Sequence, residues 1–357
     1  TGHQAVLQAW KEAGLILAVI AAWGIFFTNK KVKQRVAAQL AAWTAKAFIL
    51  VAVIVTAIYH SVGLASTFLG VKTTLAYLVL FVAVQATEFT QQRWATLMKG
   101  LLVVSSAVGL FAIAQVYLLP AVASIRIIGT FSGPNQLGSF MIIPLALSLW
   151  LVLQKKWIAT APLFLSGFAL FHSYSRSAWI GAVIATFVVL AIWLRGWWKL
   201  TLLAPIIALV IGASILSGPV KAMTTNLTFY VFHGQFIDGH TNGSDSYRLE
   251  NAKNGLIKIQ SQPNGYGLGT AGPASKDTAE PIITENSYLQ IGIETGIIGL
   301  LLFIATVGLT IIALWKQRRV VQEAIPFMAA LIGLSATNMF LHTWADSATA
   351  LVLWGLM

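Results

Sequence analysis

The chain of 357 residues is 57% hydrophobic and only 10% charged, whereas a soluble domain usually carries about 25% charged residues. Together with a mean hydropathy of +0.79, this composition excludes an ordinary soluble domain and indicates an all-α polytopic membrane protein. The net charge of +12 does not indicate a nucleic-acid partner, because the basic residues of a membrane protein mark its cytoplasmic loops. The sequence has no cysteine, which excludes disulfides and thiolate metal sites.

Apolar runs suited to crossing a bilayer recur along the whole chain. In chain order they lie near Leu15–Phe27, Trp43–Ile58, Thr73–Thr87, Leu101–Leu119, Leu137–Leu153, Ile158–Phe171, Ala178–Leu194, Leu200–Leu216, Tyr288–Trp315 and Ile325–Leu341, and an eleventh begins near Ala348. We expect about eight transmembrane helices in residues 1–216 and further ones in residues 288–357. Since the chain opens at Thr1 without methionine and the last run stops at Met357, both ends are expected to be truncated.

The basic residues alternate between the two sides of the predicted spans. One set of connections is rich in them: Lys30, Lys31, Lys33, Arg35, Arg93, Lys99, Lys155, Lys156, Arg195, Lys199, Lys316, Arg318 and Arg319. The intervening short connections hold only Lys72, Arg126 and Arg176. By the positive-inside rule the first set is cytoplasmic, so the long segment between residues 217 and 287 is predicted to face outward.

This outward segment, from Ser217 to Ser287, is the one part of the sequence long and polar enough to fold outside the bilayer, and we expect it to form an extracytoplasmic loop domain. Within it, Asp245 can cap a helix that runs to about Gln260, because apolar residues recur there at helical spacing. A run rich in glycine, from Pro263 to Gly269, then ends the helix.

Three arginines are predicted at the outer face: Arg126, Arg176 and Arg248. An arginine near a bilayer is costly unless it faces a cavity and a partner, and guanidinium matches phosphate oxygens in bidentate fashion. We therefore expect all three to bind an anion, for which a lipid-linked phosphate is an obvious partner. The alternative, strongest for Arg126, is that an individual side chain snorkels to the outer headgroups.

Polar residues also mark the entrances of two predicted helices. Asn135, among glycines at the start of one helix, could contact a sugar or diphosphate, or could be an ordinary helix cap. In TENSYLQIGIETGIIGL, Glu285 precedes Asn286, Gln290 and Glu294, which share one helix face. We expect Asn135, Asn286, Tyr288 and Gln290 to contact substrate. A carboxylate here could accept a proton, or could seat the helix through an ion pair; Glu294 is the better candidate for the ion pair.

Two further sequence patterns give weaker evidence of a functional site. Gly267, Gly269 and Gly272 spell GxGxxG, but Pro273 follows and no strand–helix–strand unit surrounds them, so a dinucleotide site is rejected. The histidines show no metal-ligand spacing. His172 and His342 lie at predicted outer helix ends, where either could serve the site or simply pack.

Four stretches, in this order, are similar to the bacterial O-antigen ligase and O-antigen polymerase family: GTFSGPNQLGSFMIIPLAL, SYSRSAWIG, SYRLENAKNGLIKIQSQPNGYGLG and TENSYLQIGIETGIIGLLLF. The resemblance covers about Gly129 to Phe303. It implies a C-type glycosyltransferase-like helical bundle in the bacterial inner membrane. Such a protein would transfer a glycan from undecaprenyl diphosphate to a sugar or glycolipid acceptor at the periplasmic face, as ligase or polymerase in cell-surface polysaccharide biosynthesis.

The resemblance also implies roles for individual residues. The paired essential arginines of the family correspond to Arg176 and Arg248, which would hold the diphosphate leaving group. Where the ligases usually have a histidine regarded as the base, this chain has Glu285, which can perform the same proton transfer. No metal, nucleotide or other cofactor is required by this mechanism. A secondary transporter or lipid-linked glycan flippase is the alternative class, but it predicts broken helices in corresponding halves, which the sequence does not show.

Overall fold

The computed structural model describes residues 40–59, 62–85, 91–118, 126–194, 244–276, 278 and 281–356. Throughout these ranges the backbone forms helices, turns and loops without a strand, which confirms the all-α prediction. The helices are α3 (Leu40–Ile58), α4 (Leu64–Gly70), α5 (Ala76–Val84), α6 (Gln91–Tyr117), α7 (Pro134–Leu153), α8 (Thr160–His172), α9 (Arg176–Trp193), α13 (Ser244–Ser261), α14 (Ser287–Gln317), α15 (Ala324–Thr337) and α16 (Ser347–Gly355). A π-helical turn, Val71–Leu75, joins α4 to α5, and single 3-10 turns lie at Trp157–Ala159, Gly272–Ser275 and Thr343–Ala345.

Six helical segments of the described chain are long and apolar enough to span a membrane: α3, the continuous α4–α5 segment, α6, α7, α9 and α14. The segment Trp157–His172, which contains α8, and α15 are apolar but shorter. The protein is thus a polytopic membrane protein. The expected runs at 15–27 and 200–216 lie outside the described residues.

The last part of the chain departs from the prediction in one respect. The run expected to continue to Leu341 ends as helix α15 at Thr337. Asn338 stops it, because its side-chain amide donates to Leu334 O (2.7 Å) and to Thr343 Oγ1, which folds the following loop back onto the helix end. This folded loop, residues 338–346, contributes to the site.

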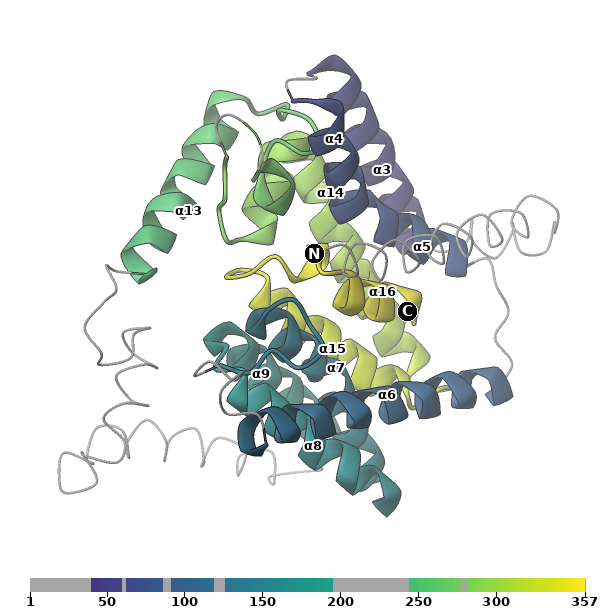
Figure 1. Ribbon diagram of the computed structural model, residues 1–357. Coiled ribbons are helices and arrows are strands. Elements are labelled where there is room, and N and C mark those ends of the chain that lie inside the picture. Colours follow the sequence, from purple (N-terminus) through teal and green to yellow (C-terminus); the bar gives the residue numbers. More distant parts are fainter. Residues whose placement is uncertain are drawn as a thin grey trace.

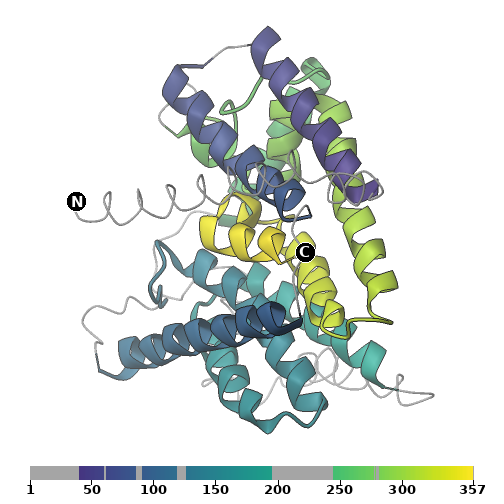
Figure 2. The same ribbon diagram turned by 90° about the vertical axis from the view of Figure 1, so that its right-hand side faces the viewer.

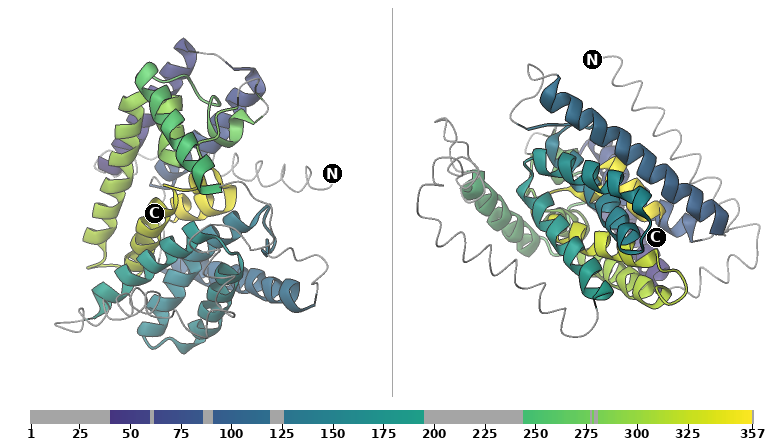
Figure 3. Two further views of the ribbon diagram at one scale, coloured as in Figure 1. Left: turned by 90° about the vertical axis from the view of Figure 1, so that its left-hand side faces the viewer. Right: turned by 90° about the horizontal axis from the view of Figure 1, so that it is seen from below.

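The helices form two groups that are connected by α14 and α15 (Figures 1 and 2). In one group α3 and α13 pack on α14, with α4 and α5 nearby, and in the other α7 and α9 pack on α15, while α8 packs on α7 and α6 packs on α8. The C-terminal helix α16 lies between the groups, against α5 and α7. Figure 3 shows α13 on the outside of the fold, beside α14.

Two glycines let α9 and α15 cross closely. A Cβ atom added to Gly181 would lie 2.7 Å from the Gly333 carbonyl oxygen and closer still to Thr337 Oγ1. Small residues at a crossing allow transmembrane helices to approach backbone to backbone. Because of this approach, Thr337 Oγ1 donates to Ser177 O at 3.2 Å, which ties the end of α15 to the first turn of α9.

The expected helix in the long polar segment is confirmed as α13, Ser244–Ser261, although Asp245 lies inside the helix and does not cap it. The chain then turns through Gly265, Gly267 and Gly269, all in the left-handed region with φ of 91°, 95° and 87°. This stretch is a loop that docks on α14: Tyr266 N donates to Ile293 O (2.8 Å). The rejection of a dinucleotide motif agrees with that geometry.

Candidate functional site

The site forms where the ends of several helices meet. Thr337, at the end of α15, is bonded to Ser177 at the start of α9, and Ser287 N, the first residue of α14, donates to Asn338 O at 3.0 Å. The starts of α9 and α14 and the end of α15 therefore lie together. These ends carry the residues that the sequence singled out.

Arg126 links the start of α7 to the turn that follows α8. Its Nε donates to Ser173 O at 3.1 Å, and its Nη2 donates to Asn135 Oδ1 at 2.7 Å. The guanidinium is therefore held by protein groups, which differs from the snorkelling alternative. The helix-cap alternative for Asn135 is wrong, because the N-cap of α7 is Gly133, and Asn135 lies one residue after Pro134 inside the helix.

Arg176 is the first residue of α9, at the same end of the bundle as Arg126. The chain reverses just before it through Tyr174, whose φ of 48° is left-handed. The turn packs directly on α7, since a Cβ atom added to Gly138 would lie 2.7 Å from Ser173 Oγ. This packing fixes a half-buried arginine next to the start of α7.

Arg248 and Glu285 form an ion pair. Arg248 lies on α13, and Glu285 directly precedes the N-cap residue of α14. Arg248 Nε donates to Glu285 Oε2 at 2.5 Å, and the two side chains are 30% and 34% exposed. A charge-assisted bond of this length is short, yet both partners remain accessible to a ligand. The sequence favoured Glu294 for an ion pair, whereas the structure gives the ion pair to Glu285. The reason is depth, because Arg248 lies beside the residue that precedes the N-cap of α14, whereas Glu294 lies about two turns inside that helix.

Glu294 lies fully buried, about two turns inside α14. Its Oε2 accepts from Thr74 Oγ1 (2.9 Å) and its Oε1 from Gly269 N (3.0 Å). Gly267 N donates to its carbonyl oxygen (2.9 Å). A carboxylate taken out of water must be hydrogen-bonded, so Glu294 anchors the loop after α13 and the π-helical turn to α14.

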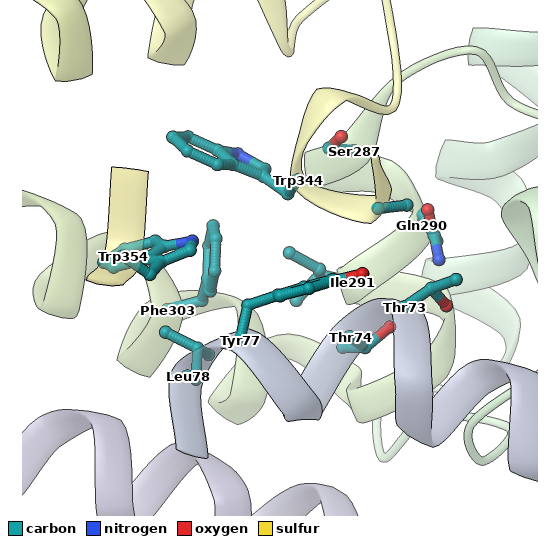
Figure 4. Close-up of a pocket in the computed structure, with 11 residues that line it drawn as sticks. Thr73, Thr74, Tyr77, Leu78, Ser287, Gln290, Ile291, Phe303, Trp344 and Trp354 are labelled. Carbon is teal, nitrogen blue, oxygen red and sulfur yellow. The ribbon is translucent and has the colours of Figure 1, made fainter. Parts of the chain in front are cut away.

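The polar residues at the start of α14 form hydrogen bonds within the protein. Asn286 Oδ1 caps the helix by accepting from Tyr288 N (2.9 Å) and Leu289 N (3.1 Å), and Tyr288 Oη donates to Ser335 O (3.0 Å). Gln290 lines a small inner cavity of about 20 Å³ with Thr74 and neighbouring residues (Figure 4), which has room for one water molecule.

A larger cavity of about 370 Å³ opens between the start of α7, the loop before α14 and the loop after α15. Its lining is mostly polar: Ser132, Asn135, Gln136, Pro273, Lys276, Ile283, Glu285, Leu341, His342, Thr343, Ala345, Asp346 and Ser347. Of the residues predicted to act on substrate, Asn135 and Glu285 line it directly, and Arg248 adjoins it through Glu285. Arg176 is not among the described residues that line it.

Sequence reasoning missed two charged residues of this cavity, Lys276 and Asp346. Asp346 carries a recognisable signal, since Asp followed three residues later by Thr349 is typical of a helix start, and Asp346 Oδ2 accepts from Thr349 N at 3.1 Å. Lys276 lies in a loop whose position depends on how it docks. No sequence pattern would have identified it.

The two histidines considered at outer helix ends differ in their surroundings. His172 Nδ1 lies 3.1 Å from Phe168 O, and its ring stacks on the Phe168 ring with centroids 4.1 Å apart, so it packs within α8. His342 lines the larger cavity. Burial, and secondarily the positive charge of Lys276, lower the pKa of His342 to about 4, so its imidazole is neutral near pH 7.

Part of the chain is similar to known proteins. Residues 161–304 match the O-antigen ligase family. An O-antigen polymerase of Salmonella muenchen is 34% identical over 91 residues, which cover 24% of this chain and 23% of that protein. The similarity therefore spans less than a quarter of that relative's length.

The fold and the site define a polytopic all-α membrane protein whose polar site lies at gathered helix ends. The predicted resemblance to O-antigen ligases and polymerases is confirmed by the match of residues 161–304 and by the similar polymerase. Arg176, Arg248 and Glu285 all lie within the matched segment, whereas Asn135 and His342 lie outside it.

We expect Glu294→Ala to detach residues 265–269 of the loop after α13 from α14, because the substitution leaves Gly269 N–H and the Thr74 hydroxyl without their buried acceptor. Each lost partner costs about 1–3 kcal/mol. Hydrogen exchange of the amides in residues 265–269 should rise in this variant. Glu250→Ala, at an exposed position of α13, is the matched control and should leave exchange unchanged; equal exchange in the two variants would contradict the anchoring role.

Proposed function

We propose that this protein is a glycosyltransferase of the O-antigen ligase and polymerase type. It transfers a glycan from undecaprenyl diphosphate to the hydroxyl of an acceptor sugar in cell-surface polysaccharide biosynthesis. The observation that carries this proposal is the Arg248–Glu285 pair at the edge of a polar cavity, inside the segment that matches the family. The guanidinium proposed to stabilise the leaving group and the carboxylate proposed to accept the proton therefore lie next to each other.

The site is proposed to face the periplasm. It lies at the starts of α7 and α14, whereas the basic residues Lys155 and Lys156 follow the other end of α7, about 30 Å away by helix rise. Lys316, at the end of α14, lies at the same far end. By the positive-inside rule the basic ends are cytoplasmic, so the site is on the outer side.

The leaving group is assigned to the arginines. As the bond between the anomeric carbon and the diphosphate breaks, negative charge develops on the diphosphate. Preorganised guanidinium groups aimed at that charge stabilise the transition state, usually the largest single contribution of such a site. Arg248, half exposed on the outer helix α13, and Arg176, fixed at the start of α9, are suited to this role from two sides.

Glu285 is proposed as the base. It accepts the proton of the acceptor hydroxyl while that oxygen attacks the anomeric carbon, and the electron pair of the broken bond leaves with undecaprenyl diphosphate. A single displacement of this kind inverts the anomeric centre. In the structure the Glu285 carboxylate is bound to Arg248, so a diphosphate that competes for this guanidinium frees the carboxylate only when donor is present. Donor binding thereby activates the base and limits hydrolysis by water.

The orientation can be tested with single cysteines, because the native chain has none. Glu250→Cys on α13 and Lys155→Cys after α7 are both at exposed positions. We expect an impermeant maleimide added to intact spheroplasts to label Cys at position 250 but not at position 155. Permeabilised cells provide the control, in which both positions label; the reverse pattern in intact cells would contradict a periplasmic site.

The arginine roles predict unequal effects of substitution on glycan transfer from purified lipid-linked donor. Arg176→Lys should fail nearly as badly as Arg176→Ala, because an ammonium keeps the charge but loses the two-pronged contact. Arg248→Ala should lower turnover by roughly 10²- to 10³-fold. Arg126→Ala should be milder, since Arg126 binds Ser173 and Asn135. Near-native turnover by Arg176→Lys would exclude the bidentate role.

The role of Glu285 predicts a separation of binding from turnover. Glu285→Gln keeps an oxygen for the Arg248 Nε bond but cannot take a proton, so turnover should fall about 10²- to 10⁴-fold with donor binding nearly intact. Glu285→His should recover part of the rate and shift its pH dependence upward, because an unperturbed imidazole titrates about two pH units above an unperturbed carboxyl. Normal turnover by Glu285→Gln would show that this residue only seats α14.

A further inference from the structure

His342 stands apart from the other polar side chains of the larger cavity. Glu285, Asn135 and Asp346 each have a side-chain or backbone partner. Both ring nitrogens of His342 are shielded from solvent and, within the residues that the structure describes, neither has a hydrogen-bond partner. A donor and an acceptor that are buried without hydrogen-bond partners lower the stability of a protein. Such a side chain is therefore a candidate for binding a ligand.

The chemical state of His342 defines what it can bind. Burial and the nearby positive charge of Lys276 keep the ring neutral, as its pKa of about 4 indicates. A neutral imidazole carries one N–H donor and one acceptor nitrogen. A hydroxyl group, which both donates and accepts, is the matching partner.

The lining of the cavity suits a polar ligand without strong net charge. The Glu285 carboxylate is paired with Arg248, and Asp346 faces the same space as Lys276, so the walls carry charges of both signs. Nine of the thirteen lining residues are polar or charged, which suits a polar ligand better than a lipid tail. The volume of about 370 Å³ lies within the usual range for small-molecule sites. A neutral polyhydroxyl ligand satisfies all three conditions.

We propose that this cavity holds the acceptor sugar and that His342 hydrogen-bonds one of its hydroxyls, next to the carboxylate of Glu285. This inference rests on the proposed function and adds the place of the acceptor. The donor diphosphate then lies on the Arg248 side of Glu285 and the acceptor on the His342 side. His342 orients the acceptor and thereby determines which sugar is used.

Binding is tested first, without any need for catalysis. The protein is labelled with ¹⁵N-histidine in detergent, and the His342 signal is assigned by its loss in His342→Gln or His342→Asn. The wild-type protein is titrated with the methyl glycosides of glucose, galactose and mannose and, separately, with inorganic pyrophosphate. We expect at least one glycoside to shift the His342 signal and to leave the His172 signal in place. A His342 signal that responds to none of the glycosides, or to pyrophosphate alone, overturns the proposal.

Kinetics then separate the acceptor site from the donor site. With saturating lipid-linked donor and a methyl glycoside as acceptor, His342→Gln should raise the acceptor KM roughly 2- to 10-fold, the effect of one neutral hydrogen bond, while the donor KM stays unchanged. His172→Gln is the matched control, because its ring packs within α8, and should alter neither constant. Transfer by His342→Gln with an unchanged acceptor KM overturns the inference. Absence of transfer by the wild-type protein refutes the proposed function instead, and the titration still decides whether a sugar binds.

Discussion

A buried carboxylate inside α14 fixes where the loop after α13 can lie. Glu294 is surrounded by protein, and burial of an unpaired carboxylate would cost more than the fold can offset. The loop after α13 therefore brings Gly269 N–H to it, and the π-helical turn brings Thr74. With the loop held there, Ile259 of α13 packs on Ile293, and Arg248 at the other end of α13 reaches Glu285. The charged pair at the entrance thus depends on the hydrogen bonds deeper in the same helix.

Helix ends rather than a single motif build the site. Arg126 binds both Asn135 at the start of α7 and Ser173 after α8, and Thr337 binds Ser177 at the start of α9. Irregular backbone at such ends is tolerated in a membrane protein where it is packed in protein or lines a cavity. The arrangement concentrates polar groups at one end of the bundle, where the proposed lipid-linked substrate would present its headgroup.

Much of this arrangement could be predicted from local sequence. The apolar runs indicated the described spanning helices, and helical spacing together with the glycines after Pro263 indicated the bounds of α13. The resemblance singled out Glu285 and Arg248, which the structure brings into contact. Two alternatives were wrong: the ion pair of Glu294 and the helix cap of Asn135. A stripe on a helix does not reveal which neighbour it meets, and a residue near a helix start is a cap only if its backbone leaves the helix.

The sequence by itself determined the class of protein and predicted on which side of the membrane each helix end lies. The length of an apolar run decides whether it can span the bilayer, and the basic residues of the loops indicate its orientation. Both are properties of short local segments. Only the tertiary structure decided which polar side chains meet. His342, Lys276 and Asp346 share a cavity with Glu285 because a docked loop and the folded loop after α15 converge there. Such contacts join residues far apart in the chain, and their geometry depends on packing and on satisfying buried polar groups, which no local pattern encodes.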